Sequence, residues 1–367
     1  MPKRNKRDSL APAEQVLLRE NDRLRRKLKY RQGVEEIINQ RLIELLAEKE
    51  LVVRTPPRVA APGGRRTGEE CVGLVHVTDT QIGKVTKSYD SNVAHARLMQ
   101  LAEHTTRYLL VHNAPRGIKE LHVYLGGDMV EGEMIFPHQA HLIDSCVLDQ
   151  ATRHAPFIFC GMLLHWLEHF QRVKVFCVSG NHGRPAGKHD TSHPKTNWDR
   201  ACYRQTEWMM KALMRERRMR AEKLDFLVAE NFYLLDEIVP GTRNLLTHGD
   251  LIRGGSTGGL PILGAERMVR RWADSIKVRG SWQNLFFGHF HQIFSFPVGS
   301  RRVYCGGTTE SDNYYALSQL GSQSMPEQVV SIWHPDFGQI DELRVKLKAG
   351  LDGKPVEQVF EIREAEG

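Results

Sequence analysis

The chain has 367 residues, of which 41% are hydrophobic, and a formal net charge of +7. This length exceeds the roughly 100–200 residues of a typical single domain, and the apolar content is sufficient for a sizeable core, which excludes a disordered protein. No apolar run approaches membrane-spanning length, and the basic amino terminus lacks the apolar segment of a signal peptide. The six cysteines form no C-x-x-C pair, which favours reduced thiols over a thiolate metal site. We therefore expect a cytoplasmic protein that does not contact a membrane.

The excess positive charge lies in residues 1–70, which hold 17 Lys and Arg against 11 Asp and Glu. Such a basic arm suits a polyanion such as nucleic acid, and a solubilising tail is the alternative. Residues 13–50 contain no proline, and six of ten heptad core positions are Leu or Ile. This pattern favours a short coiled coil in which Asn21 sets the register of a dimer, over a single amphipathic helix packed on the body. We divide this part into a basic tail and helix over 1–50 and a linker over 51–70.

From residue 71 onwards, short apolar runs alternate with helical segments. The expected strands are 72–77, 121–125, 173–178, 243–246 and 284–287. The expected helices are 91–112 and 199–222, with a further helical stretch interrupted at Pro156. This alternation predicts an α/β layered fold with central β-sheets flanked by helices, preceded by the amino-terminal helix. We assign it to residues 71–327 and expect further strands and a tail in 328–367.

Polar residues suited to binding metal ions follow each of the five expected strands. They are Asp79-Thr80-Gln81, Gly127-Asp128, Gly180-Asn181-His182, His248 and Gly288-His289-Phe290-His291. Because ligands bind at the carboxyl ends of strands in open α/β sheets, we expect these loops to converge on one site. Carboxylates, an amide oxygen and imidazoles without a thiolate suit Mn²⁺, Fe²⁺ or Zn²⁺.

This motif series resembles the calcineurin-like metallophosphoesterase superfamily, whose members carry D-x-H, G-D, G-N-H, a lone His and G-H-x-H in that order. The resemblance covers about residues 71–307 and implies two metal positions that share Asp128. The ligands would be Asp79, Gln81, Asp128 and His291 at the first position, and Asp128, Asn181, His248 and His289 at the second. A hydroxide shared by the two ions would attack phosphorus, and His182 would assist the leaving group.

Two residues depart from the family pattern. Gln81 stands where the family usually has His, and an amide oxygen is a weaker and harder ligand than imidazole. We therefore expect looser binding at the first position and a preference for Mn²⁺ or Mg²⁺ over Zn²⁺, with filling of the second position alone as the alternative. Gly183-Arg184 follows the G-N-H motif, where acidic residues are common, and Arg184 could grip a substrate phosphate.

The basic arm, the expected dimer and Arg184 together favour a nucleic-acid substrate. The motif series is similar to the SbcD-like DNA repair nucleases, which work as dimers with Mn²⁺. Only 76 residues follow His291, too few for that branch's capping and partner-binding regions, so a stand-alone or phage-type nuclease fits better. We expect a Mn²⁺-dependent DNA nuclease that acts on single- or double-stranded DNA, and we favour an exonuclease over an endonuclease. The alternatives are a nucleotide or phosphoprotein phosphatase or pyrophosphatase, and a nucleic-acid-binding or assembly protein with a weak phosphoesterase site.

Overall fold

A computed structural model describes residues 55–57, 70–136, 138–187, 195–253, 261–273, 275, 282–312, 325–351 and 353–360. The chain divides into two units, Met1–Val53 and Arg54–Gly367, and every described residue belongs to the second. The expected coiled coil over 13–50, the dimer formed through it, and most of the linker over 51–70 lie outside the described residues. They remain predictions.

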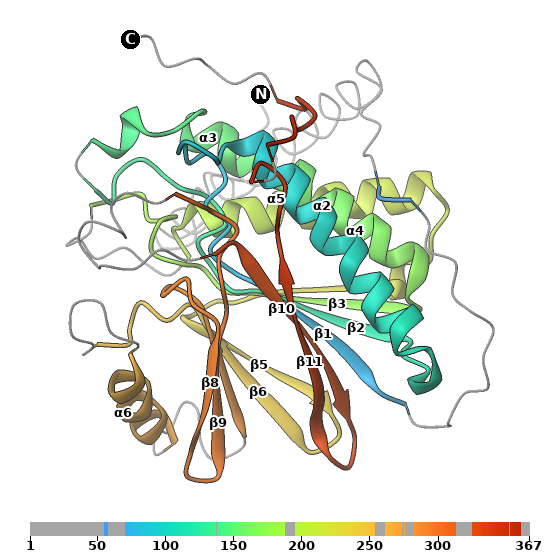
Figure 1. The fold of residues 1–367 in the computed structure, drawn as a ribbon. Helices are drawn as coiled ribbons and strands as arrows, with labels where there is room; N and C mark the ends of the chain where they lie inside the picture. The colour runs from blue at the N-terminus through green and yellow to red at the C-terminus, as the bar shows by residue number, and fades with distance from the viewer. Residues whose placement is uncertain are drawn as a thin grey trace, which may run out of the picture. The chain divides into compact units, whose positions relative to one another are not determined.

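The first of two mixed β-sheets has six strands in the order β11-β10-β1-β2-β3-β4 (Figure 1). The strands are β1 (Val72–Val77), β2 (Glu120–Leu125), β3 (Arg172–Cys177), β4 (Leu224–Val228), β10 (Glu327–His334) and β11 (Gly338–Lys346). Strands β1 to β4 pair in parallel, so their carboxyl ends share one edge of the sheet. Strand β10 pairs antiparallel with both β1 and β11, which places a late segment of the chain in the interior of the sheet.

The second sheet has five strands in the order β5-β6-β7-β9-β8. They are β5 (Tyr233–Val239), β6 (Thr242–Thr247), β7 (Asn284–Phe287), β8 (Phe294–Val298) and β9 (Arg301–Cys305). The three inner strands are parallel, and the two edge strands pair antiparallel to them.

Helices cover the outer faces of both sheets (Figure 1). The longer helices are α2 (Ser91–Arg107), α4 (Ala155–His169), α5 (Trp198–Glu216) and α6 (Ile262–Ala273), and α3 (Val147–Asp149) is a single turn. Short π-helical or 3-10 turns are η2 (Tyr108–His112), η3 (Ala114–Arg116), η4 (Gln139–His141), η5 (Gln150–His154) and η6 (Ala221–Lys223). Helices α2, α4 and α5 lie on the first sheet, and α6 lies by the second (Figure 1). Asp90 caps α2 by accepting a hydrogen bond from the backbone N–H of Val93 at 2.7 Å.

Two apolar layers hold these elements together. Leu246 and Phe286 of the second sheet pack against the first sheet, whereas their neighbours Leu245 and Leu285 face a cluster that includes residues of α6. Successive side chains of a strand point to opposite faces, so β6 and β7 are buried on both sides. The order of layers is helix, sheet, sheet, helix. The expected α/β layered fold with central sheets flanked by helices is therefore confirmed for the described part of the chain.

Two further expectations concern the whole sequence. Within the described part of the chain, no helix combines the length and hydrophobicity needed to cross a bilayer. All six cysteines are free thiols, and all except Cys146 are buried.

Candidate metal centre

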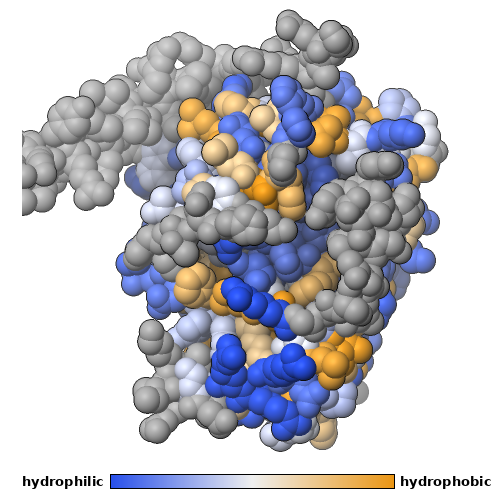
Figure 2. Space-filling model, turned by 90° about the vertical axis from the view of Figure 1, so that its left-hand side faces the viewer, coloured by the Kyte–Doolittle hydropathy of each residue, from blue (hydrophilic) through white to orange (hydrophobic). Residues whose placement is uncertain are grey.

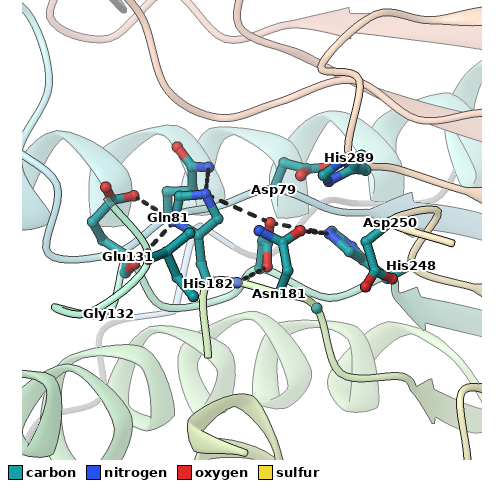
Figure 3. Close-up of polar contacts among 12 residues, drawn as sticks. Asp79, Gln81, Glu131, Gly132, Asn181, His182, His248, Asp250 and His289 are labelled. Carbon is teal, nitrogen blue, oxygen red and sulfur yellow. Dashed lines mark hydrogen bonds and ion pairs between the residues drawn. The ribbon is translucent and has the colours of Figure 1, made fainter. Parts of the chain in front are cut away.

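The five motif loops meet at the carboxyl ends of β1, β2, β3, β6 and β7. The hydrogen bonds that join them include Asp79 N to Gly127 O at 3.0 Å, His182 N to Asp128 Oδ1 at 2.7 Å, His248 Nδ1 to Gly126 O at 2.9 Å, and His289 N to Asp79 Oδ2 at 2.8 Å. Figure 3 shows their side chains turned toward a common centre. The face of the molecule seen in Figure 2 has hydrophilic residues in its recessed middle and hydrophobic residues around them.

Glycines let these loops approach one another closely. A Cβ atom on Gly180 would lie 2.1 Å from Asp128 Oδ1, and one on Gly288 would lie 2.3 Å from Asp79 Oδ2. No side chain fits at such distances, so the glycines that precede the ligands are required by packing against two buried carboxylates.

Unfavourable backbone conformations concentrate at the predicted ligands. Eight described non-glycine residues have a positive φ, and five of them are Asp79 at 51°, Gln81 at 43°, Asp128 at 53°, His289 at 71° and His291 at 56°. Such conformations cost on the order of 1–3 kcal/mol each and persist where the surrounding structure enforces them, which is characteristic of functional sites.

The second metal position is a group of side chains with lone pairs directed at one point. His248 Nδ1 donates to Gly126 O, which leaves Nε2 unprotonated in a neutral ring and free to bind an ion. That nitrogen lies 3.0 Å from Asp128 Oδ2 and 3.1 Å from Asn181 Oδ1. Asp128 Oδ2 is buried and has no hydrogen-bond donor among the described residues. Separations of this size match the edge of an octahedron whose ligands lie roughly 2.1 Å from an ion.

His289 completes this position. One nitrogen of His289, one of His248 and one oxygen of Asp128 lie within 4.8 Å of one another. Burial would lower the pKa of His248, but the Asp128 carboxylate raises it to about 10. Burial, followed by the neighbouring His248, lowers the pKa of His289 to about 4. A positive charge beside the buried Asp128 carboxylate therefore stabilises it. A divalent ion bound by this carboxylate, the Asn181 amide oxygen and the two imidazoles would supply that charge.

The first metal position is built differently. Asp79 Oδ1 lies 3.2 Å from His291 Nε2, and His291 Nδ1 lies 2.8 Å from Glu310 Oε1. Gln81 is also present, but its amide oxygen accepts a hydrogen bond from Lys84 Nζ at 2.8 Å. The Gln81 nitrogen is the atom that faces His291 Nε2, at 3.5 Å.

His182 lies beside the second position, next to Glu131 (Figure 3). Its Nδ1 is 3.0 Å from the backbone oxygen and 3.2 Å from the carboxylate of Glu131, and its Nε2 is 4.0 Å from Asp128 Oδ2. Burial would lower the pKa of His182, but Asp128 and then Glu131 raise it to about 9. With Nδ1 held by Glu131, Nε2 is the atom that can give a proton to a reacting group.

Arg184 is adjacent to the centre but is already paired. Its guanidinium forms an ion pair with Asp250, which follows His248 by two residues. The structure thus brings together all of the predicted residues except that the Arg184 side chain is directed at a carboxylate of the protein.

Several residues of the centre are absent from the five motifs. Glu131 holds His182, while Lys84 and Glu310 flank Gln81 and His291. Asp199, in the first turn of α5, accepts hydrogen bonds from the backbone N–H groups of four residues, which are Asp128, Met129, Val130 and Gly180. Burial, followed by Asp128, raises the pKa of Asp199 to about 6. The sequence offered one signal for Lys84, its spacing of three residues from Gln81 across a glycine.

Comparisons with known proteins give distant structural likenesses. No protein-family model matches the chain, and no curated protein matches it. Vacuolar protein sorting 29 from Cryptosporidium parvum is 12% identical, with 76% of this chain and 100% of that chain covered and a TM-score of 0.34. A hypothetical protein from Pyrococcus horikoshii is 12% identical, with 77% of this chain and 91% of that chain covered and a TM-score of 0.38. An archaeal phosphodiesterase is 10% identical, with 74% of this chain and 99% of that chain covered and a TM-score of 0.32. At this level of similarity, the chain's own residues are the basis for assigning its chemistry.

Proposed function

We propose that this chain is a metal-dependent phosphodiesterase that hydrolyses nucleic acid, as a DNA nuclease and preferably as an exonuclease. The observation that carries the proposal is the convergence of Asp128 Oδ2, Asn181 Oδ1 and His248 Nε2 at separations of about 3 Å, beside His289 and His182. Two of these atoms are oxygens that only accept hydrogen bonds or bind cations, and the third is an imidazole nitrogen that can bind a cation when it is unprotonated.

In this function the protein's residues would hold the ion in place and donate a proton to the leaving group. Asp128, Asn181, His248 and His289 would hold the ion, and Mn²⁺ is the ion that we expect on mixed oxygen and nitrogen ligands. When bound, a divalent ion acidifies water and stabilises charge on phosphoryl oxygens. His182 Nε2 would donate its proton to the departing alkoxide, which otherwise leaves with an unfavourable charge. Glu131 orients this imidazole through its contacts with Nδ1.

Nucleic acid is the proposed substrate because of charge. Residues 1–70 carry an excess of six basic residues, with 17 Lys and Arg against 11 Asp and Glu. Polyanions bind such segments through release of counterions. Arg184 could exchange Asp250 for a phosphate oxygen of the substrate, because guanidinium groups bind phosphate and carboxylate with similar geometry.

Hydrolysis by the purified full chain tests the proposal. Substrates would be labelled single- and double-stranded DNA and bis-p-nitrophenyl phosphate, each with Mn²⁺ and with a chelator. His248→Ala removes a proposed ligand, and the matched control is His104→Ala, because His104 is an exposed histidine on α2.

We expect DNA cleavage that requires Mn²⁺, is lost in His248→Ala and is unchanged in His104→Ala. A ladder that shortens from one end would establish exonuclease action. Hydrolysis of the small diester with intact DNA would contradict the nuclease proposal and favour a nucleotide phosphoesterase. Absence of turnover on every substrate would contradict the enzymatic function and favour a nucleic-acid-binding protein.

A further inference from the structure

The side chain of Lys84 decides which end of the Gln81 amide faces the metal centre. Lys84 Nζ lies 2.8 Å from Gln81 Oε1. An ammonium group has three donors and no acceptor, so only the amide oxygen can face it. The opposite orientation would turn the Gln81 NH₂ group onto the Lys84 ammonium group. The Gln81 NH₂ group therefore faces inward, 3.4 Å from His182 Nε2 and 3.5 Å from His291 Nε2.

A tight turn fixes this arrangement. Lys84 N donates to Gln81 O at 3.1 Å, and Gly83 between them has a φ of 103°. A turn with a positive φ at its third residue favours glycine there, and the side chains of Gln81 and Lys84 meet across it. Gly83 also cannot accept a side chain, because a Cβ atom there would lie 2.3 Å from the side chain of Gln150.

Lys84 is held in place from its other side by a buried carboxylate. Glu310 forms an ion pair with Lys84, and the two side chains are 2% and 13% exposed. The other oxygen of Glu310 lies 2.8 Å from His291 Nδ1. Rotation of Lys84 out of the centre would leave Glu310 buried without its ammonium partner, which is unfavourable.

The first metal position consequently has fewer protein ligands than the second. An amide NH₂ group has no lone pair available for a cation, so Gln81 contributes none. Asp79 and His291 remain, together with Asp128, which is shared with the second position, so water would have to complete the coordination of a second ion. A nearby ammonium group adds repulsion between like charges.

We infer that the centre holds one divalent ion, at Asp128, Asn181, His248 and His289, and that Lys84 supplies a fixed positive charge beside the position that a second ion would occupy. The inference rests on the proposed metal-dependent function and deepens it. Lys84 acts as a positioning residue, because it sets the orientation of Gln81.

Metal content tests this without reference to activity. The full chain is stripped with a chelator, loaded with Mn²⁺, separated from free ion, and analysed for Mn²⁺ per chain. Electron paramagnetic resonance distinguishes an isolated Mn²⁺ from a magnetically coupled pair. The variants are Gln81→His with Lys84→Met, which supplies an imidazole and removes the ammonium, and Lys84→Arg, which retains the charge.

We expect one uncoupled ion per chain in the natural protein and in Lys84→Arg, and two coupled ions in the double variant. Two coupled ions in the natural protein would overturn the inference while leaving the metal-dependent function intact. No bound ion would overturn both. A double variant that keeps its single ion but gains no second would show that Lys84 and Gln81 are not the cause. The count for the natural protein is decisive even if the double variant does not fold.

Discussion

The carboxylate of Asp199 connects two loops that each carry proposed metal ligands. It accepts hydrogen bonds at 2.8–3.2 Å from the backbones of Asp128, Met129 and Val130 after β2 and of Gly180 after β3. Asn197, which caps α5, donates from its side chain to Gly180 O at 2.8 Å. The start of α5 therefore sets the separation of Asp128 and Asn181 without contacting an ion.

Replacing Asp199 should damage both the fold and the metal centre. Asp199→Ala would leave four buried N–H groups without an acceptor, and each unsatisfied group costs about 1–3 kcal/mol. We expect a loss of about 3 kcal/mol or more in the free energy of unfolding, measured by urea denaturation of the metal-free protein, and weaker Mn²⁺ binding. The control is Asp225→Ala, whose partner Arg172 is exposed, and for which we expect a change within about 1 kcal/mol. Equal losses in the two variants would contradict this role.

The loss of hydrolysis rate on replacing His182 should be large only where the leaving group must accept a proton. His182→Ala should slow DNA hydrolysis by about 10²–10⁴-fold, the usual contribution of general acid catalysis. Bis-p-nitrophenyl phosphate should be affected far less, because p-nitrophenolate departs without a proton. Comparison of the two rates at saturating Mn²⁺ checks this. An equal loss on both substrates would indicate that His182 acts on binding or on the metal centre instead.

The sequence reveals the residues of the five motifs but not Lys84 and Glu310, which lie beside them in the structure. The five motifs were visible because each ligand directly follows a strand. Lys84 and Glu310 were not assigned, because 226 residues separate them in the chain and their ion pair arises only in the folded state. The orientation of the Gln81 amide depends on that pair, so residue type alone could not reveal it.

Among the secondary-structure elements, the contact between the two sheets carries a buried polar network. His122 on β2 lies 2.6 Å from Asp236 on β5 through Nδ1. The hydroxyl group of Tyr124 donates to the same carboxylate at 2.6 Å and accepts from Asn244 on β6 at 2.9 Å. These groups are buried, so hydrogen bonds within the network satisfy them.

This network should make stability depend on pH. Burial would lower the pKa of His122, but hydrogen bonds to Asp236 and Glu120 raise it overall. A raised folded pKa means that the protonated ring contributes fully below the unfolded pKa of about 6.5, and that this contribution is lost as the pH rises through the folded value. We expect the free energy of unfolding to fall over that range by more in the natural protein than in His122→Gln. Identical pH profiles of the two, measured by denaturant titration, would contradict the assignment.

The sequence predicts some strands and helices with their observed bounds and misses others. The strands at 72–77 and 284–287 appear with the expected bounds, because both are short, apolar and followed by polar loops. Strands β4, β5, β8 and β9 were not anticipated, and the partly exposed positions of β4, β5 and β8 give a weaker pattern. The helix expected over 199–222 ends at Glu216, and Arg218 has a φ of 52°, which is incompatible with a continuing helix.

For the molecule as a whole, the division at Val53 separates a basic segment from the unit that carries the metal centre. Removal of residues 1–53 should leave Mn²⁺ content and hydrolysis of the small diester unchanged. We expect DNA affinity to fall and its dependence on salt to become shallower, because fewer counterions are released. Fluorescence anisotropy over a series of salt concentrations checks this, and unchanged binding at every concentration would exclude the segment as a DNA contact. The oligomeric state of the two proteins, measured by light scattering, tests the proposed dimer.

Strand β10 has a consequence for when the centre can form during synthesis. Its Gln328 side chain donates to Thr78 O at 2.7 Å and accepts from Thr78 N at 3.3 Å, 250 residues away and directly before Asp79. At about 5–20 residues per second, translation delivers this support roughly 10–50 s after β1 leaves the ribosome. Until then the Asp79 loop lacks its neighbouring strand. A nascent chain would therefore carry an incomplete candidate metal centre until β10 has been synthesised.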